Sequence, residues 1–121
     1  MGGFQERRKQ KRFKVKTGAF AALVPSFEKL GQIKNISKSG IAFQYLGSAE
    51  KAKDSGKLEI LSIDDGFYLR ELSVKTVLDF EVDTQVPFSS LKTRQVSLQF
   101  EELEHHQKEL LDHFLEKYTY N

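Results

Sequence analysis

The stretch Leu72-Ser-Val-Lys-Thr-Val-Leu-Asp-Phe-Glu-Val82 carries the clearest secondary-structure signal in this chain of 121 residues. Apolar or β-branched residues recur at every second position, with polar neighbours between most of them. Successive side chains of a β-strand point to opposite faces, so a period of two is typical of a strand with one apolar face. The pattern therefore predicts one long strand, whose apolar positions are Leu72, Val74, Thr76, Leu78, Phe80 and Val82.

Shorter runs of the same kind lie on both sides of this strand. Polar turns separate them: Pro25-Ser26 ends one run, and Asp64-Asp65-Gly66 is a hairpin turn of the kind that favours a positive φ. Gly18 interrupts the first run and marks a bulge or a bend. Besides the long strand, we expect strands at residues 13–16, 19–24, 33–36, 41–45, 58–63, 67–69 and 96–100.

The end of the chain has a different period. Apolar residues spaced for one face of a helix run from residue 103 to residue 118, with charged and amide side chains opposite them. Several short strands followed by one amphipathic helix indicate a mainly β protein, a small antiparallel barrel of about six strands with the helix packed against or over it. The apolar face of the helix consists of Leu103, Leu110, Leu111, Phe114, Leu115 and Tyr118.

Charge is distributed unevenly, although the formal net charge is only +2. Basic residues crowd residues 6–16, and acidic residues dominate residues 101–116. Residues 1–12 are polar and show no periodicity, so we expect a flexible basic arm that orders when something binds it, followed by one domain over residues 13–121. A local basic pole on a nearly neutral body suits one anionic ligand better than a long nucleic acid, which needs a broad basic face.

Two short motifs stand near the start of the chain. The first is Arg8-x-x-x-Arg12 in the basic arm, and the second is Asn35-x-Ser37-x-x-Gly40 in a turn between two expected strands. In this order they resemble the two signatures of the PilZ domain family, RxxxR and (D/N)xSxxG. The resemblance implies a small barrel that binds the bacterial second messenger cyclic di-GMP.

The resemblance covers most of the chain. The segment from Arg94 to Phe100, with Leu103 after it, resembles the family's last strand, and Ser97 stands where glycine is expected. This departure concerns a local bend rather than the ligand site. The resemblance implies a stand-alone, single-domain PilZ protein that needs no cofactor besides its ligand and signals to an unidentified protein partner. Motility, surface polysaccharide or biofilm control are the processes that it implies.

By this resemblance the nucleotide lies between the two motifs, with the arm closing over the barrel surface. Arginine makes bidentate pairs with phosphate and with the O6/N7 edge of guanine, so the arginines of the arm suit both parts of the ligand. The asparagine amide and the serine hydroxyl can bond the remaining guanine groups, and the glycine supplies a positive φ or a close approach to the base. Binding then acts as an order–disorder switch of the arm. The expected ligand contacts are Arg7, Arg8, Arg12, Asn35, Ser37 and Gly40.

Several other classes of protein are disfavoured. The chain has no cysteine, which excludes disulfides, a cysteine zinc site and thiol catalysis. It has no signal-peptide core and no apolar run of membrane-spanning length, so we expect a soluble, cytoplasmic protein without membrane insertion. His105, His106 and His113 fit surface or capping positions better than a metal site, because adjacent histidines on a helix point in different directions. The acidic pairs at 64–65 and 101–102 fit a turn and a helix start, so we expect no enzyme.

Two further functions stay open from the residues alone. One is a PilZ-like protein-interaction module that has no nucleotide ligand. The other is a small-barrel binder of single-stranded nucleic acid, in which the basic arm follows the phosphates and exposed aromatic rings stack on bases. A steep salt dependence would identify the second of these, and saturable binding of a cyclic dinucleotide would exclude it.

Overall fold

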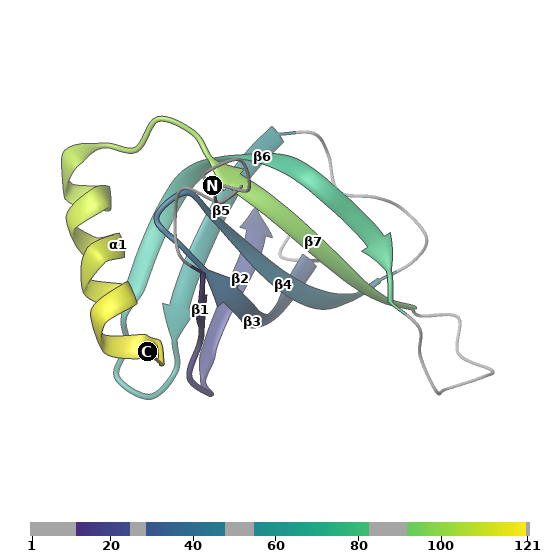
Figure 1. The fold of residues 1–121 in the computed structure, drawn as a ribbon, viewed down its shortest axis with the longest axis horizontal. Coiled ribbons are helices and arrows are strands. Elements are labelled where there is room, and N and C mark those ends of the chain that lie inside the picture. The colour runs from purple at the N-terminus through teal and green to yellow at the C-terminus, as the bar shows by residue number, and fades with distance from the viewer. Residues whose placement is uncertain (1–11, 25–28, 48–54, 83–91, 121) are drawn as a thin grey trace, which may run out of the picture.

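The computed structural model describes residues 12–24, 29–47, 55–82 and 92–120. This part of the chain forms seven strands and one helix (Figure 1). In chain order they are β1 (Phe13–Lys14), β2 (Ala19–Val24), β3 (Lys29–Ile36), β4 (Gly40–Gly47), β5 (Ser55–Ser62), β6 (Tyr68–Glu81), β7 (Lys92–Phe100) and α1 (His105–Tyr118).

The strands form an antiparallel sheet in the order β1-β3-β2-β5-β6-β7-β4, which an additional pairing between β3 and β4 closes into a barrel. β3 makes this closure possible because it serves two neighbours. Residues 29–32 pair with β2, and residues 33–36 pair with β4 across a bulge. β1 adds to the free side of β3, outside the ring. The predicted mainly β fold, a small antiparallel barrel of about six strands with a C-terminal helix, is confirmed.

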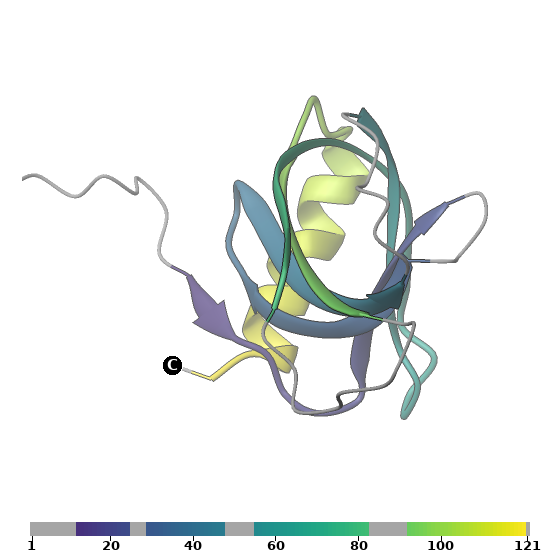
Figure 2. The same ribbon diagram turned by 90° about the vertical axis from the view of Figure 1, so that its right-hand side faces the viewer.

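Helix α1 lies across one end of the barrel (Figures 1 and 2). Its buried positions include Leu111, Phe114 and Tyr118, as the helical period predicted. The ring of Phe67, from the β5–β6 turn, lies 5.5 Å from that of Phe114 and 5.4 Å from that of Tyr118. Burying a side chain as large as Phe114 stabilises the fold by about 2 kcal/mol. The helix therefore closes the core, although one predicted member of its apolar face, Leu110, is exposed.

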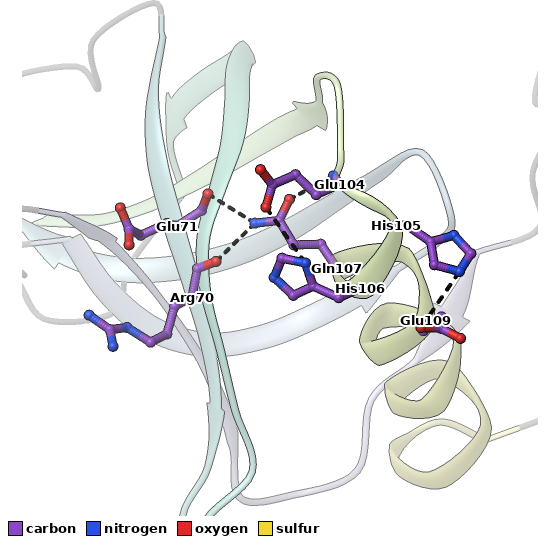
Figure 3. Close-up of polar contacts among 7 residues, drawn as sticks. All are labelled: Arg70, Glu71, Glu104, His105, His106, Gln107 and Glu109. Atoms are coloured by element: carbon purple, nitrogen blue, oxygen red, sulfur yellow. Dashed lines mark hydrogen bonds and ion pairs between the residues drawn. The ribbon is translucent and has the colours of Figure 1, made fainter.

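The helix begins at His105 rather than at residue 103. Glu104 still has an extended backbone, and its N–H donates to Gln107 Oε1 at 2.9 Å. The side-chain nitrogen of Gln107 donates to the carbonyls of Arg70 and Glu71, at 3.1 and 3.2 Å (Figure 3). Glu71 has a left-handed φ of 54°. Gln107 thus joins the helix start to the one non-glycine residue with a positive φ among those described.

β6 differs most from its sequence prediction. Residues 67–69 and 72–82 were expected as separate runs, yet Tyr68–Glu81 is one strand that bends at Glu71. A bulge lies between Thr76 and Leu78 in the pairing with β7. A bulge adds one residue and reverses the faces beyond it. The prediction of one apolar face is therefore wrong after Thr76, where Leu78 and Phe80 are 56% and 43% exposed.

The face reversal brings Asp79 into the barrel. Arg94 Nε lies 2.8 Å from Asp79 Oδ1, and the Arg94 and Asp79 side chains are only 6% and 2% exposed. The Tyr45 hydroxyl donates to Asp79 Oδ2 at 2.8 Å. Burial and the bond to Asp79 raise the pKa of Tyr45 to about 12, so this tyrosine stays neutral. The cluster is a buried ion pair with a neutral donor, inside the barrel.

Asp65, in the β5–β6 turn, is bonded to the end of the helix. Its carboxylate accepts bonds from the Tyr118 hydroxyl and from the Phe67 N–H, and it lies 3.0 Å from Lys117 Nζ. Gly66, the next residue, has a φ of 74°, so the predicted turn at residues 64–66 is confirmed. The hydrogen bond from Tyr118, then the bond from Lys117, hold the pKa of Asp65 well below its ordinary value of 3.8.

We expect Asp65→Asn to lower the stability of the protein in a pH-dependent way. A carboxyl group whose pKa is lowered on folding contributes stability above its unfolded pKa, and that contribution is lost as the pH falls toward the folded pKa. The gap in urea midpoint between parent and variant should thus be constant above about pH 4 and shrink below it. Asp64→Asn removes a neighbouring exposed carboxylate as the control, and an unchanging gap down to about pH 2 would contradict the prediction.

Candidate ligand-binding site

The second motif forms the turn between β3 and β4. The Ser37 N–H donates to the Gly40 carbonyl at 2.8 Å, and Ser37 Oγ accepts from the N–H groups of Ser39 and Gly40, at 3.1 and 3.2 Å. Ser37 is buried. Its hydroxyl therefore organises the turn. The expected contact between Ser37 and guanine stays a prediction, and sequence reasoning missed this structural role.

Gly40 lies against β7. A Cβ at Gly40 would stand 2.5 Å from the Leu98 carbonyl oxygen, which is closer than real contacts allow. On the same side the Phe100 N–H donates to the Ser39 carbonyl at 2.8 Å. Gly40 is not among the residues with a positive φ. The glycine thus permits a close approach between two strands, and its predicted contact with a base stays a prediction.

We expect Gly40→Ala to destabilise the barrel by about 2 kcal/mol, because a methyl group there forces the backbones of β4 and β7 apart. Urea unfolding measures the loss. Gly56→Ala is the matched control: Gly56 also lies in a strand, but a Cβ there meets nothing within 4 Å, so the change should stay within about 0.5 kcal/mol. Equal effects of the two substitutions would contradict the proposed cause.

Asn35 lies on the outer face of the barrel. Its neighbour Ile36 is fully buried in the core, and the bulge after Ile33 places Asn35 half-buried on the opposite side. Asn35 pairs with Lys14 of β1 on one side and with Ala42 of β4 on the other. Its amide therefore lies in a row of outward positions that begins at the basic segment.

Ser97 continues that row on the next strand. It pairs with Ala42 of β4 and with Leu78 of β6, directly beside the β6 bulge. Its neighbours Val96 and Leu98 are buried in the core, so the Ser97 side chain faces outward. The departure from glycine at this position therefore puts a hydroxyl on the outer face.

The first motif reaches the turn through β1. Phe13 pairs with Ile36, and Lys14 pairs with Asn35. In an antiparallel pair the next residue back, Arg12, falls opposite Ser37. Arg12 is exposed, so its side chain is available beside the turn. The structure thus brings Arg12 to the second motif, whereas Arg7 and Arg8 lie outside the described residues.

Residues 14–16, at and just after β1, also pair with the end of α1 and the residues that follow it. The Lys16 N–H donates to the Tyr118 carbonyl at 2.8 Å, and the Tyr120 N–H donates to the Lys14 carbonyl at 2.9 Å. A bridge joins Val15 to Thr119, and Figure 2 shows the C-terminal end of the chain close to β1. The segment that follows Arg12 is therefore held between β3 and residues 118–120. Nothing in the sequence motifs indicated this second pairing.

The turn also contacts the helix directly. Lys38 Nζ lies 4.0 Å from Asp112 Oδ1, and both side chains are exposed. Exposed pairs of this kind contribute at most about 1 kcal/mol. Together with the pairing of residues 118–120, this contact means that α1 and the residues after it touch the turn of the second motif and residues 14–16, which follow Arg12.

Two of the three histidines of the helix have acidic neighbours, and the third, His113, lies beside the Phe67 ring. His105 Nε2 lies 3.7 Å from Glu109, and His106 Nδ1 lies 3.6 Å from Glu104 (Figure 3). Within the described ranges, no group of three or more histidine, cysteine, aspartate or glutamate residues could hold a metal ion. In the same part of the chain, no helix has the length and hydrophobicity to cross a bilayer.

Several solved structures are similar to this fold. The PilZ domain of YcgR from Escherichia coli, with cyclic di-GMP, is 12% identical, with a TM-score of 0.63 over 88% of this chain and 87% of that one. K. pneumonia MrkH in complex with cyclic di-GMP is 16% identical, with a TM-score of 0.61 over 91% of this chain and 51% of that one. Bacillus subtilis MotI (DgrA), an inhibitor of motility, is 16% identical, with a TM-score of 0.59 over 93% and 51%.

The chain therefore has the PilZ-domain fold, and the resemblance predicted from its motifs is confirmed at the level of the fold. No family model matches the sequence, and no curated protein matches it. The chain spans about half the length of MrkH and of MotI.

Proposed function

We propose that this protein is a cyclic di-GMP receptor module. The observation that carries the proposal is the register of β1 with β3, which sets Arg12 of the first motif beside the Ser37–Gly40 turn of the second. Arg12, the one described residue of the first motif, is thus close to the second motif, and Asn35 faces outward on the same strand as Ser37.

The chemistry of that surface suits a compact dianion with two guanines. The guanidinium of Arg12, with Arg7 and Arg8 from the arm, would pair with phosphate oxygens and with guanine O6 and N7. Asn35 offers both a donor and an acceptor to the rest of a base. Because Ser37 and Gly40 fix the turn before any ligand arrives, this half of the site needs little ordering on binding.

Proteins of the same fold support the ligand class. The YcgR domain and MrkH are described as structures with cyclic di-GMP, and MrkH is described as a transcription regulatory factor that depends on it. MotI is described as an inhibitor of motility. We propose by this likeness that the chain acts in the cytoplasm on a downstream protein, in motility or biofilm control, and that it makes and breaks no bond in its ligand.

The contacts of β1 suggest how binding is passed on. Ligand binding orders the arm at Arg12, and the following residues, 14–16, are hydrogen-bonded to residues 118–120 at the end of α1. A change in the conformation of the arm can therefore be passed to the end of the helix through β1, which is only two residues long. In this proposal the ligand favours the state in which arm, β1 and helix end are docked together.

Calorimetric titration of the purified protein with cyclic di-GMP tests the proposal, with GMP and cyclic di-AMP as controls. We expect saturable heat from cyclic di-GMP alone, with one or two molecules bound per chain. No heat from any of the three would contradict the proposal and would direct attention to protein partners. Equal binding of single-stranded oligonucleotides, with a steep salt dependence, would favour a nucleic-acid binder instead.

A further inference from the structure

A pocket separate from the motif turn opens on the outer face, where β3 leaves β4 to pair with β2. Its volume is about 330 Å³, at the lower end for small-molecule sites. We call it the strand pocket. Its walls include Leu30, Gln32 and Lys34 of β3, Gln44 and Leu46 of β4, and Thr93 of β7.

The strand pocket exists because β3 changes partners. Residues 33–36 of β3 pair with β4, whereas residues 29–32 pair with β2 instead. β3 and β4 still approach each other at one point, where a Cβ on Gly31 would stand 1.5 Å from the Gln44 carbonyl oxygen. Only glycine fits there, so bare backbone forms part of the pocket lining.

The polar groups of the pocket favour an anion. Lys34 is exposed at its rim and makes no ion pair with any described residue. The described lining contains no carboxylate. Tyr45, which also lines the pocket, stays neutral because burial and its hydrogen bond to Asp79 raise its pKa to about 12. The local charge is therefore positive.

The remaining walls suit a flat apolar body. Leu30 and Leu46 are 47% and 62% exposed, an arrangement that leaves two large apolar side chains in water at the pocket. The side-chain nitrogen of Gln44 donates to Gln95 at 3.1 Å, which fixes the amide and leaves its oxygen free to accept. A planar ring between the leucines would cover apolar surface, while its acidic group would face Lys34.

From these walls we infer that the strand pocket binds a small organic anion, a planar ring that carries a carboxylate or a phosphate. The apolar end of the pocket, at Leu30 and Leu46, is distinct from the proposed nucleotide site, whereas Lys34 at the rim is the neighbour of Asn35 in β3. β4 runs from Gly40 at the turn to Leu46 in the pocket, and six residues of strand span about 20 Å. A single ring in the pocket does not reach the motif turn.

NMR titration of the isotope-labelled full chain with benzoate tests this inference. We expect saturable shifts that centre on the amides of Gln32, Gln44 and Thr93. Benzyl alcohol, which has the ring without the charge, and inorganic phosphate, which has the charge without the ring, should both bind more weakly. Saturable binding of phenyl phosphate at the same amides also supports the inference, and its rank against benzoate identifies the preferred acidic group.

Two pairs of variants decide whether the walls act as argued. Lys34→Gln and Leu46→Ser should each weaken benzoate binding, by about fivefold for the lost charge. Lys108→Gln, an exposed lysine on α1, and Val77→Ser, an exposed apolar residue on β6, should leave it unchanged. The inference is overturned if shifts scatter over the surface, if Lys34→Gln binds as the parent does, or if phosphate alone matches benzoate.

Discussion

Arg12→Ala should abolish cyclic di-GMP binding while the barrel stays folded. Arg12 is exposed and precedes β1, so its side chain contributes nothing to the core. In the proposed complex it makes two charge-assisted hydrogen bonds, each worth at least about 1.5 kcal/mol. Their loss corresponds to a weakening of more than about 100-fold in a calorimetric titration. We expect the same of Arg8→Ala, since the two arginines hold the same ligand.

Two control variants test the role of the Arg12 guanidinium: one separates its planar geometry from its charge, and the other removes an arginine elsewhere. Arg12→Lys keeps the charge but loses the planar fork, so it should bind more weakly than the parent and better than Arg12→Ala. Arg70→Ala removes an exposed arginine that lies over the Tyr68 ring on β6, and it should bind as the parent does. Parent-like affinity in Arg12→Ala, with an unchanged circular dichroism spectrum, would refute the assigned role.

Asp79→Ala should destabilise the protein by about 4 kcal/mol, because it leaves the Arg94 guanidinium buried without its counter-ion. It also removes the acceptor of the Tyr45 hydroxyl. A guanidinium keeps its proton in proteins even without a counter-ion, so Arg94 cannot escape the penalty in the variant by becoming neutral. Urea or thermal unfolding measures the loss.

An exposed ion pair supplies the matched comparison. Asp112→Ala breaks the pair with Lys38 at the surface, and its effect should stay below about 1 kcal/mol. The double variant Asp79→Leu/Arg94→Met replaces both buried charges by apolar groups and should regain most of the stability. A loss in Asp79→Ala no larger than that in Asp112→Ala would contradict the assignment of Asp79 as the counter-ion of Arg94.

The elements whose neighbours are close in the sequence could be predicted. The period of the last helix identified Leu111, Phe114 and Tyr118 as its buried face, because the periodicity of a helix is local. The turn at Gly66 was likewise predicted, since positive φ is a property of the residue type. The closed barrel was also inferred correctly, although the strand order could not be derived from these patterns.

The features that depend on distant partners could not be predicted. The bulge after Thr76 leaves no mark in the sequence, because Val77 and Leu78 are both apolar and either could continue the alternation. The inward turn of Asp79 is favourable only with Arg94, on another strand. At the candidate site, the resemblance of the motifs predicted that Arg12 lies near the turn, but it did not indicate that the Ser37 hydroxyl bonds within its own turn.

The short ribbon made by β1 and residues 118–120 has a consequence for hydrogen exchange. The barrel ring is complete without it, because β3 pairs with β4, so the ribbon can open locally while the ring stays closed. The amides of Lys16 and Tyr120, which donate across the ribbon, therefore exchange through this opening rather than through global unfolding. We expect that any contact that immobilises Arg12 will slow exchange at Tyr120, so that ligand binding at one end of the chain could be followed at a single amide at the other.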